Sequence, residues 1–116
     1  MPTQESRREV RVPTRIFVNV TQNDQSQYLS RAVDLSSNGV QLSRLPEERP
    51  ESRFAWLLFW LPTSSELIRA LGERVHERDG EHLSFVGYRF KYLSPKHRVL
   101  LQQYLDVQTQ RVRKAA

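Results

Sequence analysis

The stretch RREVRVPTRIFVNV, residues 7–20, combines four arginines with the alternation of a β-strand. Its aliphatic residues all fall on even positions: Val10, Val12, Ile16, Val18 and Val20. Three of the arginines fall on odd positions: Arg7, Arg11 and Arg15. A period of two puts alternate side chains on opposite faces of a strand, so the pattern predicts a strand with one buried face. Because proline cannot donate a ladder hydrogen bond, we expect Pro13 to separate a leading arm from a strand over residues 15–21.

The residues that follow predict short strands joined by turns. QNDQSQ, residues 22–27, predicts a turn, and YLSRAVDL, residues 28–35, predicts a second strand. The Asn-Gly pair of SSNG, residues 36–39, tolerates positive φ angles and leads into a short strand over residues 40–43. After a loop rich in proline and charge, FAWLLFWL at residues 54–61 is apolar throughout. Because both its faces are apolar, we expect it to be the most buried strand.

The stretch ELIRALGERVHER, residues 66–78, has the composition of a helix, but its pattern predicts a strand. Apolar side chains recur at the odd positions Leu67, Leu71 and Val75, and the glycine between them would interrupt a helix. An Asp-Gly pair then predicts a tight hairpin turn. It leads into HLSFVGYRFKYL, residues 82–93, where large apolar residues alternate with glycine, arginine and lysine.

The C-terminal part of the chain predicts one helix. Ser94 and Pro95 suit the N-cap and the first turn, and no helix breaker follows them. Apolar residues at helical spacing would dock this helix on the sheet: Leu101, Tyr104, Leu105 and Val112. A length of 116 residues with 38% hydrophobic and 27% charged residues fits one domain around a single core.

The composition excludes several classes of function. The chain has no cysteine, which excludes a disulfide, a thiolate nucleophile and a Cys-ligated zinc site. It begins without a signal-peptide pattern, and its longest apolar run, residues 54–61, is too short to span a bilayer, so we expect a cytoplasmic protein without membrane insertion. The net charge is +5, and 15 arginines stand against 3 lysines. Arginine suits planar recognition of phosphates and guanine edges, which favours an anionic partner, although a GC-rich genome would produce the same bias.

The stretch DLSSNG, residues 34–39, carries polar groups that complement the arginines. Asp34 and Ser36 are two residues apart, so in an extended chain their side chains point the same way. Gly39 lets the backbone turn or approach another group closely. A guanine nucleotide needs an arginine for O6 and N7 of its base, a carboxylate for its N1 and N2 donors, and further arginines for its phosphates. The two stretches together therefore point to a guanine nucleotide.

In this order and at this separation, Arg7-x-x-x-Arg11 and Asp34-x-Ser36-x-x-Gly39 resemble the paired RxxxR and [D/N]xSxxG signature of PilZ domains, which are bacterial receptors of cyclic di-GMP. The stretch GYRF near the end of the last predicted strand is similar to the segment that closes many PilZ barrels. The resemblance covers nearly the whole chain.

The resemblance implies an all-β fold with a C-terminal helix. The expected barrel has six antiparallel strands in a PilZ-like split-barrel arrangement, and the helix covers about residues 95–113. The expected organisation is a single domain with an arginine-bearing arm over residues 1–14, the barrel over residues 15–93 and the helical region over residues 94–116. The ligand would be held between the arm and the barrel surface.

Carried over position by position, the resemblance implies the following ligand-binding residues: Arg7, Arg8, Arg11, Asp34, Ser36, Asn38 and Gly39. The two arginines of RxxxR would bind guanine edges and phosphates, with Arg8 as an auxiliary cation. The Asp and Ser of the second motif would hydrogen-bond a guanine base, and the Asn-Gly pair would shape the turn beside it. Ser6 stands where family members that bind an intercalated ligand dimer have another arginine, which favours one ligand per chain. Cyclic di-GMP is a signalling ligand here, and no cofactor is implied.

The charge of the arm predicts how a ligand would act. Four arginines within nine residues repel one another in the free protein, so we expect the arm to be mobile without ligand. A dianionic dinucleotide would remove that repulsion and order the segment. The ordered arm would then present a new surface to a protein partner, and the chain would signal in trans.

The alternatives fit the residues less well. An enzyme is not expected, because the chain has no G-x-S-x-G, phosphate-cradling glycine loop or zinc helix motif. HERDGEH, residues 76–82, has metal-ligating residue types, but its spacing favours a charged hairpin tip. His76 and Arg15 are further candidates for ligand contact. A basic barrel could bind single-stranded nucleic acid, but the aromatic residues of the apolar run are expected in the core. A protein adaptor that needs no ligand, its arginines paired with Glu5 and Glu9, is the remaining alternative.

Overall fold

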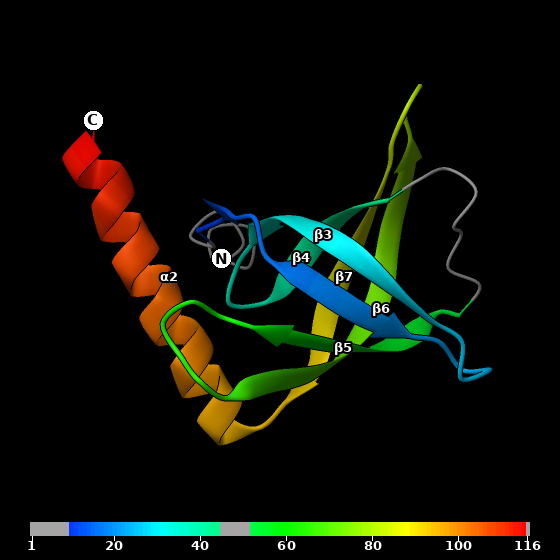
Figure 1. The fold of residues 1–116 in the computed structure, drawn as a ribbon, viewed down its shortest axis with the longest axis horizontal. Coiled ribbons are helices and arrows are strands. Elements are labelled where there is room, and N and C mark those ends of the chain that lie inside the picture. The colour runs from blue at the N-terminus through cyan, green and yellow to red at the C-terminus, as the bar shows by residue number, and fades with distance from the viewer. Residues whose placement is uncertain (1–9, 45–51, 116) are drawn as a thin grey trace, which may run out of the picture.

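The structure is a computed structural model that describes residues 10–44 and 52–115, with side chains as far as Arg111. In this part of the chain there are seven strands and one helix (Figure 1). The elements are β1 (Val12–Pro13), β2 (Phe17–Thr21), β3 (Gln27–Leu35), β4 (Gly39–Arg44), β5 (Phe54–Trp60), β6 (Leu67–Asp79), β7 (Ser84–Leu93) and α2 (Pro95–Ala115). Most of the loop predicted between β4 and β5 lies outside the described residues.

Six of these strands close into an antiparallel barrel. The hydrogen-bonded order is β3-β2-β5-β6-β7-β4, and β4 pairs in turn with β3, which completes the ring. The additional strand, β1, pairs with the end of β3 beyond the residues that pair with β2. Closure removes the unpaired edges that an open sheet would expose. The predicted six-stranded barrel followed by a helix is confirmed.

Alternation along the strands places one set of side chains inside the barrel. In β2, Val18 and Val20 are fully buried and Phe17 is exposed, as the period of two predicts. Val12 is buried as well. Val10 is 53% exposed, because it precedes the first residue that pairs with β3. The predicted strand is therefore confirmed, but its buried face begins at β1.

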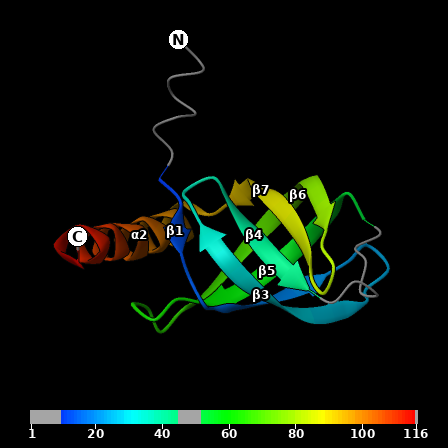
Figure 2. The same ribbon diagram turned by 90° about the horizontal axis from the view of Figure 1, so that it is seen from above.

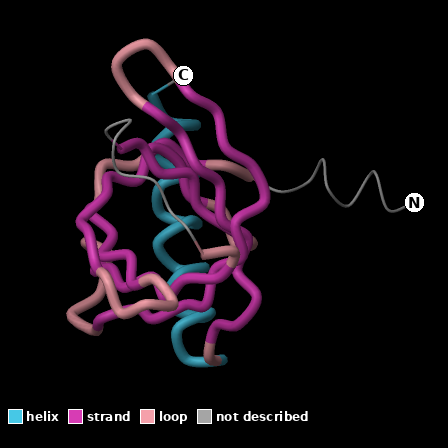
Figure 3. The backbone as a smooth tube through the Cα atoms, turned by 90° about the vertical axis from the view of Figure 1, so that its right-hand side faces the viewer, coloured by secondary structure: helices cyan, strands magenta, loops and turns pink. Residues whose placement is uncertain are grey.

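The helix α2 lies across one end of the barrel (Figures 2 and 3). Three of its predicted apolar residues are buried and join the barrel core: Leu101, Tyr104 and Leu105. The side chain of the fourth, Val112, lies outside the described part of the chain. None of the helical residues that the structure describes forms a span long and apolar enough to cross a membrane.

The predicted start of the helix is confirmed by its capping hydrogen bonds. The backbone N–H of His97 donates to Ser94 Oγ at 3.1 Å, and the N–H of Arg98 donates to the Ser94 carbonyl at 2.8 Å. Ser94 is thus the N-cap and Pro95 the first helical residue, where its missing N–H costs no hydrogen bond.

The apolar stretch that forms β5 is not the most buried strand, and that prediction was wrong. Ala55, Leu57 and Phe59 point into the core, but the residues between them are half-buried, and Trp60 is 62% exposed. Strand β5 pairs with β2 on one edge and β6 on the other, so its edges are covered. A barrel strand nevertheless has only one face toward the core. The other face of β5 carries Phe54, Trp56, Leu58 and Trp60 on the outside of the barrel.

The prediction of a strand over residues 66–78 is confirmed, but the odd positions that suggested it face outward. The side chains of Ile68 and Ala70 are fully buried, whereas Leu67 and Leu71 are half-buried and Val75 is half exposed. The pairing of β6 with β7 is irregular between Leu71 and Gly72 and again between Arg74 and His76. Such bulges change which side chains share a face, and the sequence period does not reveal them.

The turn between β6 and β7 differs from the glycine-based prediction, whereas the turn predicted over residues 22–27 is confirmed. The connection between β6 and β7 spans residues 80–83, where the Gly80 N–H donates to the Leu83 carbonyl at 2.8 Å. None of the described glycines has a positive φ, so this is not the two-residue turn that an Asp-Gly pair favours. In the turn between β2 and β3, Gln25 has the positive φ, 73°.

Candidate ligand-binding site

Strand β1 brings an arginine of the first motif to the aspartate of the second. Pro13 pairs with Asp34, and the N–H of Thr14 donates to the Val33 carbonyl at 3.1 Å. Pro13 thus lies within a short additional strand, a position where proline is tolerated. Two residues earlier, Arg11 Nη1 lies 3.0 Å from Asp34 Oδ1. The side chain of Arg11 is half exposed, so this ion pair lies at the surface, within reach of a ligand.

Ser36 is oriented differently from Asp34. Its side chain is fully buried, and its Oγ accepts hydrogen bonds from the N–H groups of Asn38 and Gly39, both at 3.2 Å. Strand β3 ends at Leu35 after an irregular register with β4. Two residues at even positions therefore no longer point to the same side here, as they would in a regular strand. The hydroxyl stabilises the turn that follows β3. Its predicted hydrogen bond to a guanine stays a prediction.

The turn formed by Ser36–Gly39 is fixed against β7. The N–H of Phe90 donates to the Asn38 carbonyl at 2.7 Å. A Cβ at Gly39 would collide with the carbonyl oxygen of Tyr88. The φ of Gly39 is not positive, so glycine is needed here for the close approach of two backbones. The exposed Asn38 is held at a fixed position above this contact.

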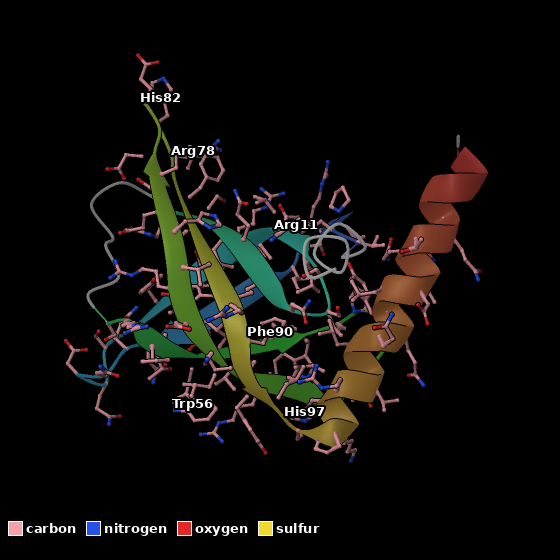
Figure 4. The ribbon with its side chains drawn as sticks, turned by 180° about the vertical axis from the view of Figure 1, so that it is seen from behind. Arg11, Trp56, Arg78, His82, Phe90 and His97 are labelled. Atoms are coloured by element: carbon pink, nitrogen blue, oxygen red, sulfur yellow. The ribbon has the colours of Figure 1, made fainter. Side chains whose placement is uncertain are left out.

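A pocket of about 230 Å³ opens between β4, β6, β7 and Arg11, the residue directly before β1. It is lined by Arg11, Asn38, Gly39, Val40, Val75, His76, Gly87, Tyr88 and Arg89. Figure 4, which shows the molecule from behind, places β6 and β7 toward the viewer with Arg11 to one side of them. The structure thus brings parts of both sequence motifs to one concave surface.

His76 contributes a flat ring to this pocket. A Cβ at Gly87 would fall among the atoms of the His76 imidazole, so the ring lies directly over the backbone of β7. His76 was a further candidate for ligand contact, and its position in the pocket lining supports that candidacy. The role of Gly87 could not be predicted, because it depends on the irregular pairing of β6 with β7.

Arg89 is a pocket residue in the GYRF stretch, which was expected to close the barrel, and it was not among the predicted ligand-binding residues. Its Nη2 lies 2.9 Å from Glu73 Oε1, and Arg53 Nη2 lies 2.6 Å from the other carboxylate oxygen. Lys91 Nζ is 3.8 Å from Oε1. The hydrogen bonds from Arg89 and then Arg53 hold the pKa of Glu73 below its ordinary value. Three cations therefore surround one ionised carboxylate, and one of them, Arg89, brings positive charge to the pocket lining.

The remaining predicted residues lie either outside the described part of the chain or away from the pocket lining. Arg7 and Arg8 lie outside the described residues, as does most of the arm whose mobility was predicted. Arg15 is described and exposed, but it does not line the pocket.

The paired motifs, the closed barrel and the C-terminal helix occur together in one protein family. The sequence profile of the PilZ domain matches residues 5–106. The chain belongs to the PilZ domain family. No curated protein sequence matches it.

Solved structures of PilZ proteins share the fold. The PilZ domain of YcgR from Escherichia coli with c-di-GMP is 20% identical, with a TM-score of 0.66, and the match covers 93% of this chain and 95% of that one. The inhibitor of motility MotI/DgrA from Bacillus subtilis is 14% identical, with a TM-score of 0.74 and coverage of 89% and 51%. MrkH from K. pneumonia is 16% identical, with a TM-score of 0.68 and coverage of 95% and 51%. The chain thus spans about half of the MotI and MrkH chains.

Proposed function

We propose that this PilZ domain is a receptor for cyclic di-GMP. The observation that carries the proposal is the Arg11–Asp34 ion pair at the edge of a pocket that His76 and Arg89 also line. The c-di-GMP complex of the YcgR domain, whose fold is similar, supports the choice of ligand.

The ion pair offers the two kinds of group that a guanine base requires. Arg11 can donate to O6 and N7, and Asp34 can accept from the N1 and N2 donors. In the structure these side chains bind each other at the surface, where a ligand can reach them. On ligand binding, each would exchange a partly exposed ion pair for hydrogen bonds to a base. His76 would stack on the purine ring, and Arg89 would attract a phosphate.

The other motif residues complete the proposed site. Arg7 and Arg8 would add phosphate and guanine contacts from the arm. Asn38 and Gly39 would shape the turn beside the ligand, and Ser36 would hold that turn or bind the base after its hydroxyl is released. Ordering of the arm would expose a surface for a protein effector, so the domain would act as an adaptor in trans and not as an enzyme.

Isothermal titration calorimetry tests the ligand. The titrants are cyclic di-GMP, cyclic di-AMP, GTP and single-stranded DNA. We expect preferential binding of cyclic di-GMP. Arg11→Ala should weaken it at least about tenfold, because one bidentate arginine–guanine contact contributes on the order of 1–3 kcal/mol of discrimination. Arg98→Ala, the same change at an exposed position on α2, is the matched control and should bind as the wild type does.

The other possible results identify the alternatives. Salt-sensitive binding of DNA without a dinucleotide preference would identify a nucleic-acid-binding barrel instead. Absence of binding to all four titrants would favour an adaptor that needs no ligand. That second candidate has one observation in its favour, because Arg11 and Asp34 form an ion pair with each other.

A further inference from the structure

The outer surface of β2, β3 and β5 carries large apolar side chains. Phe17 on β2 is 61% exposed, Leu29 on β3 is 62% exposed and Trp60 at the end of β5 is 62% exposed. These three strands are neighbours in the barrel, in the order β3-β2-β5. In Figure 1 they are the blue, cyan and green strands of the near side.

Strand register brings these side chains to one groove. Asn19 on β2 is paired with Leu29 on one side and Leu58 on the other, and Trp60 is paired with Leu67 on β6. Residues paired directly across strands share a face and touch. The groove has a volume of about 410 Å³ and is lined by Phe17, Asn19, Gln27, Leu29, Leu58, Phe59, Trp60 and Leu67.

Two arginines lie beside this apolar groove. Arg31 is paired with Phe17, and Arg69 is paired with Leu58, so both arginines lie on the face that carries the groove. The Arg69 guanidinium carbon lies 3.7 Å from the centre of the Trp56 ring. No carboxylate lines the groove, and neither arginine has a carboxylate partner within the described part of the chain.

We propose that the groove is a docking site for an amphipathic segment of another protein that carries acidic side chains beside its apolar ones. Apolar side chains of that segment would enter the groove, and its carboxylates would bind Arg31 and Arg69. This is the helix-in-groove mode of recognition, with charge complementarity at the rim.

The same observations argue against three other occupants. A second copy of this chain would bring the arginines of two protomers together, and each chain has a net charge of +5. A membrane surface is flat, whereas the apolar residues here line a concave groove. Single-stranded nucleic acid stacks on aromatic rings in wet, basic grooves, whereas three leucines contribute to this lining.

The groove is separate from the candidate ligand pocket. The pocket takes residues from β4 and β7, which lie across the ring from β2 and β5. Both sites take residues from β6, but from its opposite ends, Leu67 and the Val75–His76 pair. The docking proposal does not rest on the identity of the nucleotide. Changes in the groove should leave nucleotide binding unaltered.

The test is a selection from a displayed library of random peptides about four helical turns long, with the full chain immobilised. We expect enriched peptides to repeat apolar residues at helical spacing and to carry Asp or Glu beside them. Leu29→Ser and Trp60→Ala should each weaken a selected peptide at least about tenfold. Arg31→Glu combined with Arg69→Glu should do the same and should restore binding to a peptide whose acids are changed to lysine.

Tyr92→Ala is the matched control, because Tyr92 is a similarly exposed aromatic residue on β7 and lies outside the groove lining. It should bind the peptide as the wild type does, and all folded groove variants should bind cyclic di-GMP as the wild type does. The proposal is overturned if selected peptides lack acidic residues or bind equally to the groove variants. It is also overturned if the groove variants instead abolish self-association, binding to phosphatidylglycerol vesicles or binding to oligo(dT).

Discussion

Thr14 and Tyr104 share a hydrogen bond, with their hydroxyl oxygens 2.7 Å apart. Thr14 directly follows β1, the strand beside which Arg11 lies, and Tyr104 belongs to the buried face of α2. The bond therefore ties the segment that presents the candidate ligand-binding arginine to the helix at the end of the barrel.

A double-mutant cycle measures how much this hydrogen bond contributes to stability. Thr14→Val and Tyr104→Phe each remove one hydroxyl and nearly keep the side-chain shape, and each should lower the free energy of unfolding by about 1 kcal/mol. The double variant should lose little more than either single variant, because the bond can be lost only once. Urea unfolding is the measurement. Thr21→Val combined with Tyr104→Phe is the control and should be additive, and additivity of the Thr14–Tyr104 pair would contradict the prediction.

Gly39→Ala should destabilise the barrel. The added methyl group would meet the backbone carbonyl of Tyr88, and two paired strands cannot move apart without weakening their ladder. Overpacking of this kind costs about 1–3 kcal/mol. Thermal or urea unfolding would detect it, with Ser37→Ala in the same turn as a control that changes stability by no more than about 0.5 kcal/mol. A Gly39→Ala protein as stable as the wild type would mean that the turn can move to make room for the methyl group.

Gly87→Ala should affect ligand binding more than stability. Its methyl group would displace the His76 imidazole, an exposed side chain that can rotate away. If the ring stacks on the proposed ligand, Gly87→Ala and His76→Ala should each weaken cyclic di-GMP binding by a similar factor. The combined variant should be no weaker than either one. Calorimetry of the three variants tests this. If the combined variant loses affinity by the product of the two single factors, the glycine does not act through the histidine.

Glu73→Gln should change how stability depends on pH. The arginines around Glu73 lower its folded-state pKa below the ordinary value of 4.5, so the ionised carboxylate stabilises the folded state. That contribution is fully present above pH 4.5 and is lost as the pH falls through the lower folded-state pKa. The wild type should therefore be more stable than Glu73→Gln at neutral pH, and the difference should shrink in acid. The measurement is the melting temperature of both proteins from neutral pH down to below pH 4.5. A difference in melting temperature between the two proteins that does not vary with pH would contradict the prediction.

Much of the fold could be predicted from local sequence signals. Alternating Val18 and Val20 specified the buried face of β2, and the Ser94-Pro95 pair specified the start of α2. These signals depend on near neighbours in the chain. Which face of β6 points inward could not be predicted, because apolar residues occur on both faces and the choice depends on two irregular pairings with β7.

The candidate site was predictable only where a motif exists. Asp34 and Arg11 were expected to act together, and their contact is present. Gly87 and Arg89 belong to the GYRF stretch, which was expected to close the barrel and not to line the ligand pocket. Their places in the pocket depend on two partners, His76 and Glu73, that the pairing of β6 with β7 brings near. The exposed Trp60 was expected inside, because an apolar run does not show which of its faces the barrel leaves outside.

The closed ring of strands also determines how the molecule opens. A strand in an open sheet can peel from an edge by breaking one ladder, but every strand of this ring is held by ladders on both sides. Backbone amides of β2 to β7 should consequently exchange with deuterated solvent through one shared opening of the whole barrel. Amides of α2 beyond Leu105, the last buried side chain that the structure describes in the helix, should exchange much earlier through fraying.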